Sequence, residues 1–196
     1  MAQKDPAKPM NATQLLAADH RKVEELFESY EKARGEDRKR KLAQQICLEL
    51  KIHAQIEEEI FYPAVKGAVD EELLNEAYVE HDGAKVLIQE IEAGGPDEAF
   101  YDAKIKVLSE QIEHHVYEEE RMNDSMFAQA RKAGVDMDAL GEQLMARKQE
   151  LMAQAEAGGL PPAEPKTFVG GELAEGGEDF GEVGAAEGEK PGAEAR

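Results

Sequence analysis

Apolar residues at helical spacing recur in four successive segments of this chain, and each of these four stripes contains a histidine. The stripes are Leu16, His20, Val23, Phe27 and Tyr30; Leu42, Ile46, Leu50, His53, Glu57 and Ile60; Leu74, Ala77, His81, Ala84, Ile88 and Ile91; and Ile105, Leu108, Ile112, His115, Glu119 and Met122. Steps of three and four residues place the members of a stripe on one helix face. The pattern predicts four amphipathic helices whose histidines face a shared core.

Helix-breaking residues divide these segments. Asn11 or Thr13 can cap the start of the first helix, Arg34-Gly35 ends it, and Gly94-Gly95-Pro96 ends the third. A fifth, shorter helix is predicted over about 136–154, with Leu140, Leu144 and Leu151 as its packing residues. Short loops between four helices predict an all-α fold, an up-down-up-down four-helix bundle with a short fifth helix.

The two ends of the chain differ from the centre in composition. Residues 158–196 contain ten glycines and nine acidic residues, so this segment has little apolar surface to bury. We therefore expect a disordered N-terminus at 1–10, the bundle with its fifth helix at 11–156, and a disordered Gly/Glu-rich C-terminal tail at 157–196.

Charge and cysteine content limit the partners and the compartment. The formal net charge of −20 disfavours nucleic acid and acidic membranes as partners, whereas a basic protein could bind the acidic tail. Cys47 is the single cysteine, and no signal peptide or membrane span is evident. We expect a soluble, cytoplasmic protein, and the sequence leaves its oligomeric state open.

The histidine stripes repeat in order, which indicates a site of two metal ions. His20 precedes the pair His53 and Glu57, and His81 precedes His115 and Glu119, so each half of the chain offers one histidine and one His-x-x-x-Glu. Residues four apart lie on one helix face, and a carboxylate in an apolar stripe needs a cation or strong hydrogen bonds. Mixed imidazole and carboxylate donors favour non-haem iron, with manganese or zinc less favoured.

The register of the fourth helix leaves an alternative open. His114 and Glu118 have the same spacing as His115 and Glu119, although the apolar steps favour the latter pair. Glu58 is a further alternate ligand. An isolated His-x-x-x-Glu is more often a solvated ion pair than a metal site, so the prediction depends on all four stripes together.

Carboxylates next to these histidines have two possible roles. Asp19, Glu80 and Asp82 could each orient an imidazole, although surface charge is the more usual role. Glu58 and Glu120 extend the acidic runs, and we expect most residues of those runs to face water or lysines.

Taken in order, these motifs resemble the hemerythrin-like proteins of the HHE cation-binding type. The matching motifs are Asp19-His20, His53-Ala-Gln-Ile-Glu57-Glu58, Glu80-His81-Asp82 and His115-Val-Tyr-Glu-Glu119-Glu120, and the resemblance covers about residues 12–122. It implies a four-helix bundle with a non-haem di-iron centre. The implied ligands are His20, His53, Glu57, His81, His115 and Glu119, with both glutamates bridging.

The chain departs from the oxygen-carrying members of that family. Lys85 stands where they have a further histidine ligand, so the resemblance implies an open coordination position on each iron. This favours a protein that binds or senses oxygen, peroxide, nitric oxide or iron. A di-iron oxidase, such as a ferroxidase or a peroxide-consuming enzyme, is the alternative, and a metal-stabilised interaction protein is a second one.

Overall fold

The computed structural model describes residues 9–168, and all the regular structure in that range is helical. The elements are α1 (Ala12–Lys32), α2 (Glu36–Ile56), η1 (Glu57–Phe61), α3 (Tyr62–Val65), α4 (Glu71–Ala93), α5 (Tyr101–Val116), η2 (Tyr117–Arg121), α6 (Met126–Lys132) and α7 (Met137–Gly158). Here η1 and η2 are single π-helical turns that continue α2 and α5.

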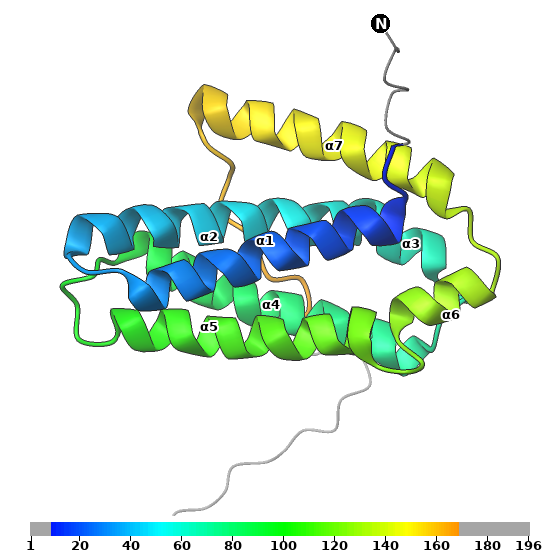
Figure 1. The fold of residues 1–196 in the computed structure, drawn as a ribbon, viewed down its shortest axis with the longest axis horizontal. Coiled ribbons are helices and arrows are strands. Elements are labelled where there is room, and N and C mark those ends of the chain that lie inside the picture. Colours follow the sequence, from blue (N-terminus) through cyan, green and yellow to red (C-terminus); the bar gives the residue numbers. More distant parts are fainter. Residues whose placement is uncertain (1–8, 169–196) are drawn as a thin grey trace, which may run out of the picture.

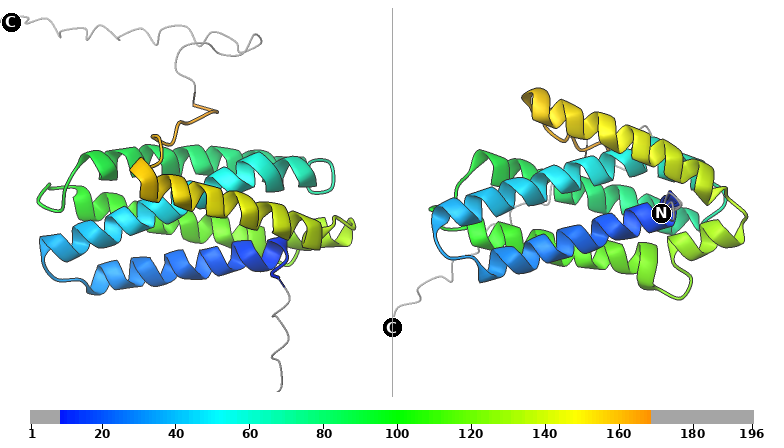
Figure 2. Two further views of the ribbon diagram at one scale, coloured as in Figure 1. Left: turned by 90° about the horizontal axis from the view of Figure 1, so that it is seen from above. Right: turned by 45° about the horizontal axis from the view of Figure 1, so that its top comes forward.

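The four long helices α1, α2, α4 and α5 form the bundle (Figure 1). Each contacts its neighbour in chain order, and α1 also contacts α5, which closes the bundle. Helix α7 lies outside it, across α1 and α2 (Figure 2). The predicted all-α bundle with a fifth helix is confirmed.

Local signals in the sequence account for the ends of these helices. The Asn11 side chain accepts the backbone N–H of Gln14, and the Gln14 side chain accepts the backbone N–H of Asn11, so the two form a capping box. The side chains of Asp70, Ser125 and Asp136 each accept a backbone N–H from the first turn of α4, α6 and α7. Gly35 and Gly134 have positive φ angles of 84° and 82° where the chain turns between helices.

Two apolar clusters fill the bundle, and the stripe histidines lie between them. On α1, His20 separates Leu16 in one cluster from Val23 in the other. On α2, His53 separates Ile56 from Leu50 in the same way. The polar site is therefore a layer within the core and has apolar packing on both sides.

The sequence did not predict α6, where Met126, Phe127 and Ala130 are buried. Helix α7 packs with Leu140, Leu144 and Leu151 buried, as predicted, but it continues to Gly158 and has 22 residues, so it is not the short helix that was expected. Residues 160–168, which fall within the predicted tail, lie against the bundle; residues 1–8 and 169–196 are outside the described range.

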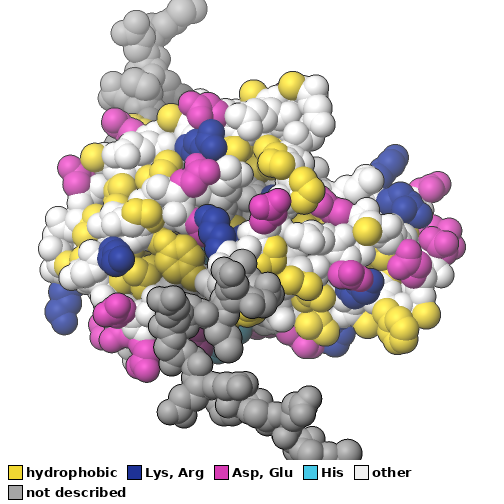
Figure 3. Space-filling model, turned by 180° about the vertical axis from the view of Figure 1, so that it is seen from behind, with side chains coloured by type: hydrophobic (Ala, Val, Ile, Leu, Met, Phe, Trp, Pro, Cys, Tyr) yellow, Lys and Arg dark blue, Asp and Glu magenta, His cyan; other side chains and the backbone are white. Residues whose placement is uncertain are grey.

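Acidic and basic side chains are interspersed among hydrophobic ones on the face opposite to that of Figure 1 (Figure 3). The acidic excess is thus spread over this face and not gathered into one patch. Within residues 9–168, no helix is apolar over a stretch long enough to cross a membrane.

Candidate metal centre

The structure brings the six predicted ligand residues together at one depth of the bundle. All six are buried, and they come from four elements or their continuations: α1, α2 with η1, α4, and α5 with η2. Two groups of potential ligand atoms result, each spanning at most 4.8 Å. The groups are His20, His53, Glu57 and Glu119; and Glu57, His81 and His115.

The imidazoles face each other in two pairs. The Nε2 atoms of His20 and His53 are 3.1 Å apart, and those of His81 and His115 are 3.3 Å apart. One pair joins the helices of the first half of the bundle and the other joins the helices of the second half. Each pair offers two nitrogen donors to one point in space.

The two glutamates link these pairs. Glu57 Oε2 lies 3.2 Å from His53 Nε2 and 3.4 Å from His81 Nε2, and Glu119 Oε2 lies 3.6 Å from His20 Nε2 and 3.5 Å from His115 Nε2. Each carboxylate thus reaches both pairs. This arrangement suits two cations joined by two carboxylates.

Further carboxylates contact the Nδ1 atoms on the other side of the rings. His20 Nδ1 is 3.1 Å from Glu120, His81 Nδ1 is 3.1 Å from Glu58, His115 Nδ1 is 2.8 Å from Glu80, and His53 Nδ1 is 3.8 Å from Asp19. In His20, His81 and His115 the carboxylate is within hydrogen-bond distance of Nδ1 and favours the tautomer that carries its proton there, which leaves the Nε2 lone pair free for a metal.

This outer ring of carboxylates corrects several expectations. Glu58 pairs with lysines, as expected, but it also contacts His81, and Glu120 contacts His20. Surface charge was also the favoured role for Asp19 and Glu80, yet both lie beside imidazoles. Only Asp82 contacts no imidazole among the described interactions. The signal that could have revealed the ring is adjacency, because each of these carboxylates directly neighbours a stripe His or Glu in the sequence.

On α5, the histidine that the apolar spacing favoured, His115, is the one that faces the core. His115 is 2% exposed and belongs to the buried group, whereas the His114 side chain is 58% exposed and points away from it. His114 lies 3.5 Å from both Glu80 and Glu118 at the surface. The alternate Glu58 meets His81 through Nδ1 and not through Nε2, so it stands outside the buried groups.

Lys85, the departure from oxygen carriers, is itself buried. Its ammonium lies 2.7 Å from Glu58 and 2.9 Å from Asp82. It therefore neutralises a carboxylate that contacts His81. Burial would raise the pKa of Glu58, but hydrogen bonds from His81, Lys166 and Lys85 outweigh it and lower that pKa to about 2.

Tyr62 adds a hydroxyl donor, and a π-helical turn precedes it. The Tyr62 hydroxyl donates to Glu119 at 2.9 Å and lies 3.2 Å from His81 Nε2. Burial, together with the charges of Glu119 and Glu57, raises the pKa of Tyr62 well above 10, so the phenol stays protonated.

Each π turn begins at or close to a stripe glutamate, and such turns are frequent at functional sites.

The buried polar atoms fit a cation. Both carboxylate oxygens of Glu57, and Oε2 of Glu119, are fully buried and have no hydrogen-bond partner. Burial, and then repulsion from Glu119, raises the pKa of Glu57, while burial lowers the pKa of His20 well below 6.5 and that of His81 to about 4. The unprotonated imidazoles of His20 and His81, beside unpartnered carboxylates, are donors that a divalent metal ion satisfies.

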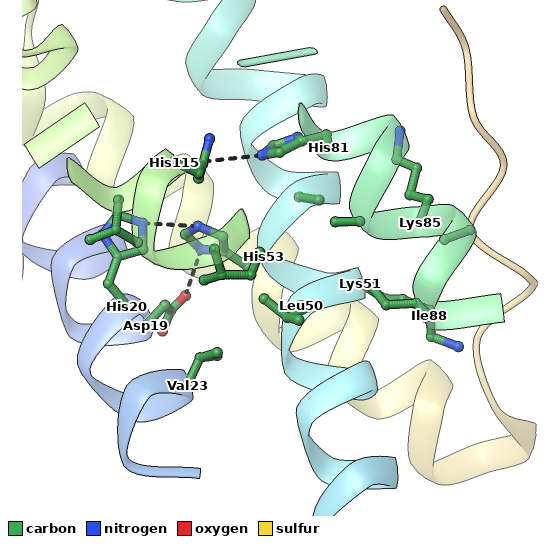
Figure 4. A pocket seen from close by; sticks show the side chains of 15 residues that line it. Asp19, His20, Val23, Leu50, Lys51, His53, His81, Lys85, Ile88 and His115 are labelled. Carbon is green, nitrogen blue, oxygen red and sulfur yellow. Dashed lines mark hydrogen bonds and ion pairs between the residues drawn. The ribbon is translucent and has the colours of Figure 1, made fainter. Parts of the chain in front are cut away.

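A small cavity opens onto the imidazoles from the side of α2 and α4 (Figure 4). Its volume is about 30 Å³, roughly enough for two water molecules. The wall is mostly apolar and includes Val23, Leu50, Ile88 and Ile112, with Lys51, Lys85 and Ala163 among its other residues. A small, uncharged molecule could reach the Nε2 side of the site from this cavity.

Comparisons with known proteins agree with this geometry. Residues 11–123 match the hemerythrin HHE cation-binding domain. A crystal structure of a hemerythrin HHE cation-binding domain-containing protein from Mycobacterium kansasii has the same fold, with a TM-score of 0.64 and 23% identity over 76% of this chain and 91% of that one. A protein named DNA nickase from Nostoc sp. is 30% identical over 111 residues, which are 57% of this chain and 32% of that protein. The chain therefore spans about a third of the Nostoc relative, and it belongs to the hemerythrin HHE cation-binding domain family.

Proposed function

We propose that this chain is a non-haem di-iron protein that binds or senses a small molecule, namely oxygen, peroxide or nitric oxide, or iron itself. The observation that supports it most strongly is the buried set of four imidazole Nε2 atoms and two carboxylates, several of whose oxygens have no other partner. His20, His53, His81 and His115 would hold the metal ions, and Glu57 and Glu119 would bridge them. The bound iron would supply reversible one-electron chemistry and open coordination positions.

The chain's own residues prepare this site. The carboxylates at Nδ1 hold the imidazole protons away from the metal side. The Tyr62 hydroxyl keeps a proton beside Glu119 and His81, where it can be donated to a ligand. The apolar cavity favours a small ligand of low charge over a large or ionic one.

The test is ligand binding by the iron-loaded protein. After anaerobic loading with ferrous iron, addition of oxygen, nitric oxide or hydrogen peroxide should produce new absorption in the near ultraviolet or visible range. The His53→Ala variant should lose this response, and the matched surface variant His114→Ala should keep it. A loaded protein whose spectrum none of the three molecules changes would contradict the proposal.

A peroxide-consuming enzyme is the second candidate, favoured by the Tyr62 proton donor, which contacts His81, a residue that lines the cavity. Disproportionation converts two hydrogen peroxide molecules into two waters and one dioxygen, so it needs no further reductant. Continuous oxygen release over many equivalents of peroxide would support it. A single stoichiometric reaction followed by inactivity would leave binding or sensing as the function.

The activity in the name of the Nostoc relative is not part of this proposal. Only 32% of that protein is matched, and a net charge of −20 disfavours approach to a phosphate backbone.

A further inference from the structure

Residues 160–168, which we call the strap, run from the end of α7 over α2 to α4 (Figure 4). The Gln89 side chain donates to the Ala163 carbonyl, and Asp82 accepts the backbone N–H groups of Lys166, at 2.7 Å, and of Thr167. The Lys166 ammonium lies 2.7 Å from Glu58, the carboxylate that contacts His81. The strap is therefore attached to the bundle at the level of the candidate metal centre.

The strap also forms part of the wall between that centre and the surface. Ala163 lines the small cavity beside the imidazoles. On its outer side is a groove of about 370 Å³, lined by α2, by η1 and by the strap. Lys51, Lys85 and Ala163 line both spaces, so the groove and the cavity adjoin at these three residues.

Of these three residues, the two lysines are held by ion pairs within the bundle. Lys51 lies 2.6 Å from Glu92, and Lys85 pairs with Glu58 and Asp82. The strap is less firmly held, because none of its residues is buried and few hydrogen bonds attach it. Segments with few buried contacts open at lower free energy than the helices they cover. Pro161 and Pro162 restrict the backbone, so the strap has fewer open conformations to lose when it closes.

We propose that the strap is a size-selective gate that determines which molecules reach the centre. In its closed position it admits molecules of about two heavy atoms, such as dioxygen, nitric oxide and hydrogen peroxide, and excludes organic hydroperoxides and chelators. The inference rests on the proposed iron function, since it assigns the specificity of that site.

The experiment compares the full-length chain with a variant whose strap is loosened. Gln89→Ala combined with Lys166→Ala removes two strap attachments. Gln44→Ala on α2 combined with Lys106→Ala on α5 changes the same residue types at exposed positions and is the matched control. With the iron-loaded proteins, we would measure the rate of iron removal by ferrozine and the ratio of reaction rates with cumene hydroperoxide and hydrogen peroxide. The strap variant should show at least a tenfold increase in both quantities, and the control should match wild type. Equal values in the strap variant and the control would overturn the gate.

A measurement on the iron-free protein separates this inference from the proposed function. The backbone amides of Lys166 and Thr167 should exchange with deuterium at least tenfold more slowly than in an unstructured peptide, and Asp82→Ala should remove this protection. Exchange at the unstructured rate in wild type would exclude a closed strap, whatever the metal does. Conversely, the amides of Lys166 and Thr167 could be protected and ferrozine could remove iron slowly, while the loaded protein reacts with no peroxide. That result would support the gate and contradict the proposed function.

Discussion

Each of the four central histidines lies close to a carboxylate through Nδ1, and in His20, His81 and His115 a hydrogen bond there decides which ring nitrogen is available to a metal. The contacts come from Glu120, Asp19, Glu58 and Glu80, and each of these four is also held by a cation or a second histidine. The outer ring thus resists rotation of the rings. We infer that iron affinity depends on these carboxylates as well as on the predicted ligands.

Adjacent histidines on α5 allow a matched test of the register. His115→Ala removes a donor from the buried group and should lower bound iron from two per chain to one or fewer, whereas His114→Ala should leave two. Metal analysis after anaerobic loading and desalting measures both. The reverse ranking of the two variants would contradict the assignment.

The unusual pKa of His81 predicts how the iron-free protein responds to acid. Burial lowers that pKa to about 4, against about 6.5 in the unfolded chain. Between these values the unfolded state binds more protons, so the free energy of unfolding falls as pH falls from about 6.5 to 4, by up to about 3 kcal/mol from this group. His20 acts in the same direction, whereas the raised pKa of His115, caused by Glu119 and Glu80 against the effect of burial, acts in the opposite one.

Urea denaturation at pH 4.5 and 7 measures this dependence. In His81→Gln the difference between the two pH values should shrink, and in the exposed His114→Gln it should remain. Identical pH profiles for His81→Gln and wild type would show that His81 is not the group responsible.

At the scale of elements, α7 is fixed by a close approach to the start of α1. A Cβ at Gly141 would lie 2.5 Å from the Met10 carbonyl oxygen and 2.8 Å from Asn11 Cα. Overpacking against backbone costs about 1–3 kcal/mol, and the gain in helix propensity offsets about 1 kcal/mol of it, so Gly141→Ala should destabilise the protein by up to about 2 kcal/mol. Unfolding in urea, followed by circular dichroism, measures the change.

Gly158 provides the control within the same helix. A Cβ there meets nothing within 4 Å, so Gly158→Ala should leave stability unchanged or slightly higher. If both alanine variants behave alike, the contact between α7 and the start of α1 does not determine their stability.

The sequence predicts elements best where one face of a helix is apolar. All four stripes became the buried faces of α1, α2, α4 and α5, and the position of each histidine within its stripe placed it in the core. The apolar steps even distinguished His115 from His114. Which residues of a helix face the core depends on their spacing along the helix, and that spacing is a local property of the sequence.

Features that depend on distant contacts were not predictable. The π turns after Ile56 and Val116 have the same residue types as an α-helix, so no local signal marks them. The strap is proline-rich and polar, and it is ordered by Asp82 and Gln89, which lie about 75 to 85 residues earlier in the chain. Asp19 and Glu80 gained their roles from rings on other helices.

At the scale of the whole molecule, the bundle places carboxylates where only a cation makes them favourable. Iron should therefore stabilise the fold: at 1,000 times its dissociation constant, a bound ion adds about 4 kcal/mol. For a chain of this size that is roughly a 10 °C rise in melting temperature. Differential scanning calorimetry with and without iron measures the shift, and equal melting temperatures would contradict the prediction.

Glu57→Gln should separate stability from metal binding. It removes a buried charge that Glu119 repels, so the iron-free variant should melt at a higher temperature than iron-free wild type. It also removes a bridging carboxylate, so iron should no longer raise its melting temperature. An iron-dependent rise as large as in wild type would show that Glu57 does not bridge.

The central claim is that six residues from four helices hold two metal ions. Iron content per chain, measured after anaerobic loading with ferrous iron and removal of free metal, tests it most directly. The account predicts two irons in wild type and in His114→Ala, and clearly fewer in His53→Ala and Glu119→Ala. Well under two irons in wild type, or full loading of the His53 and Glu119 variants, would contradict it.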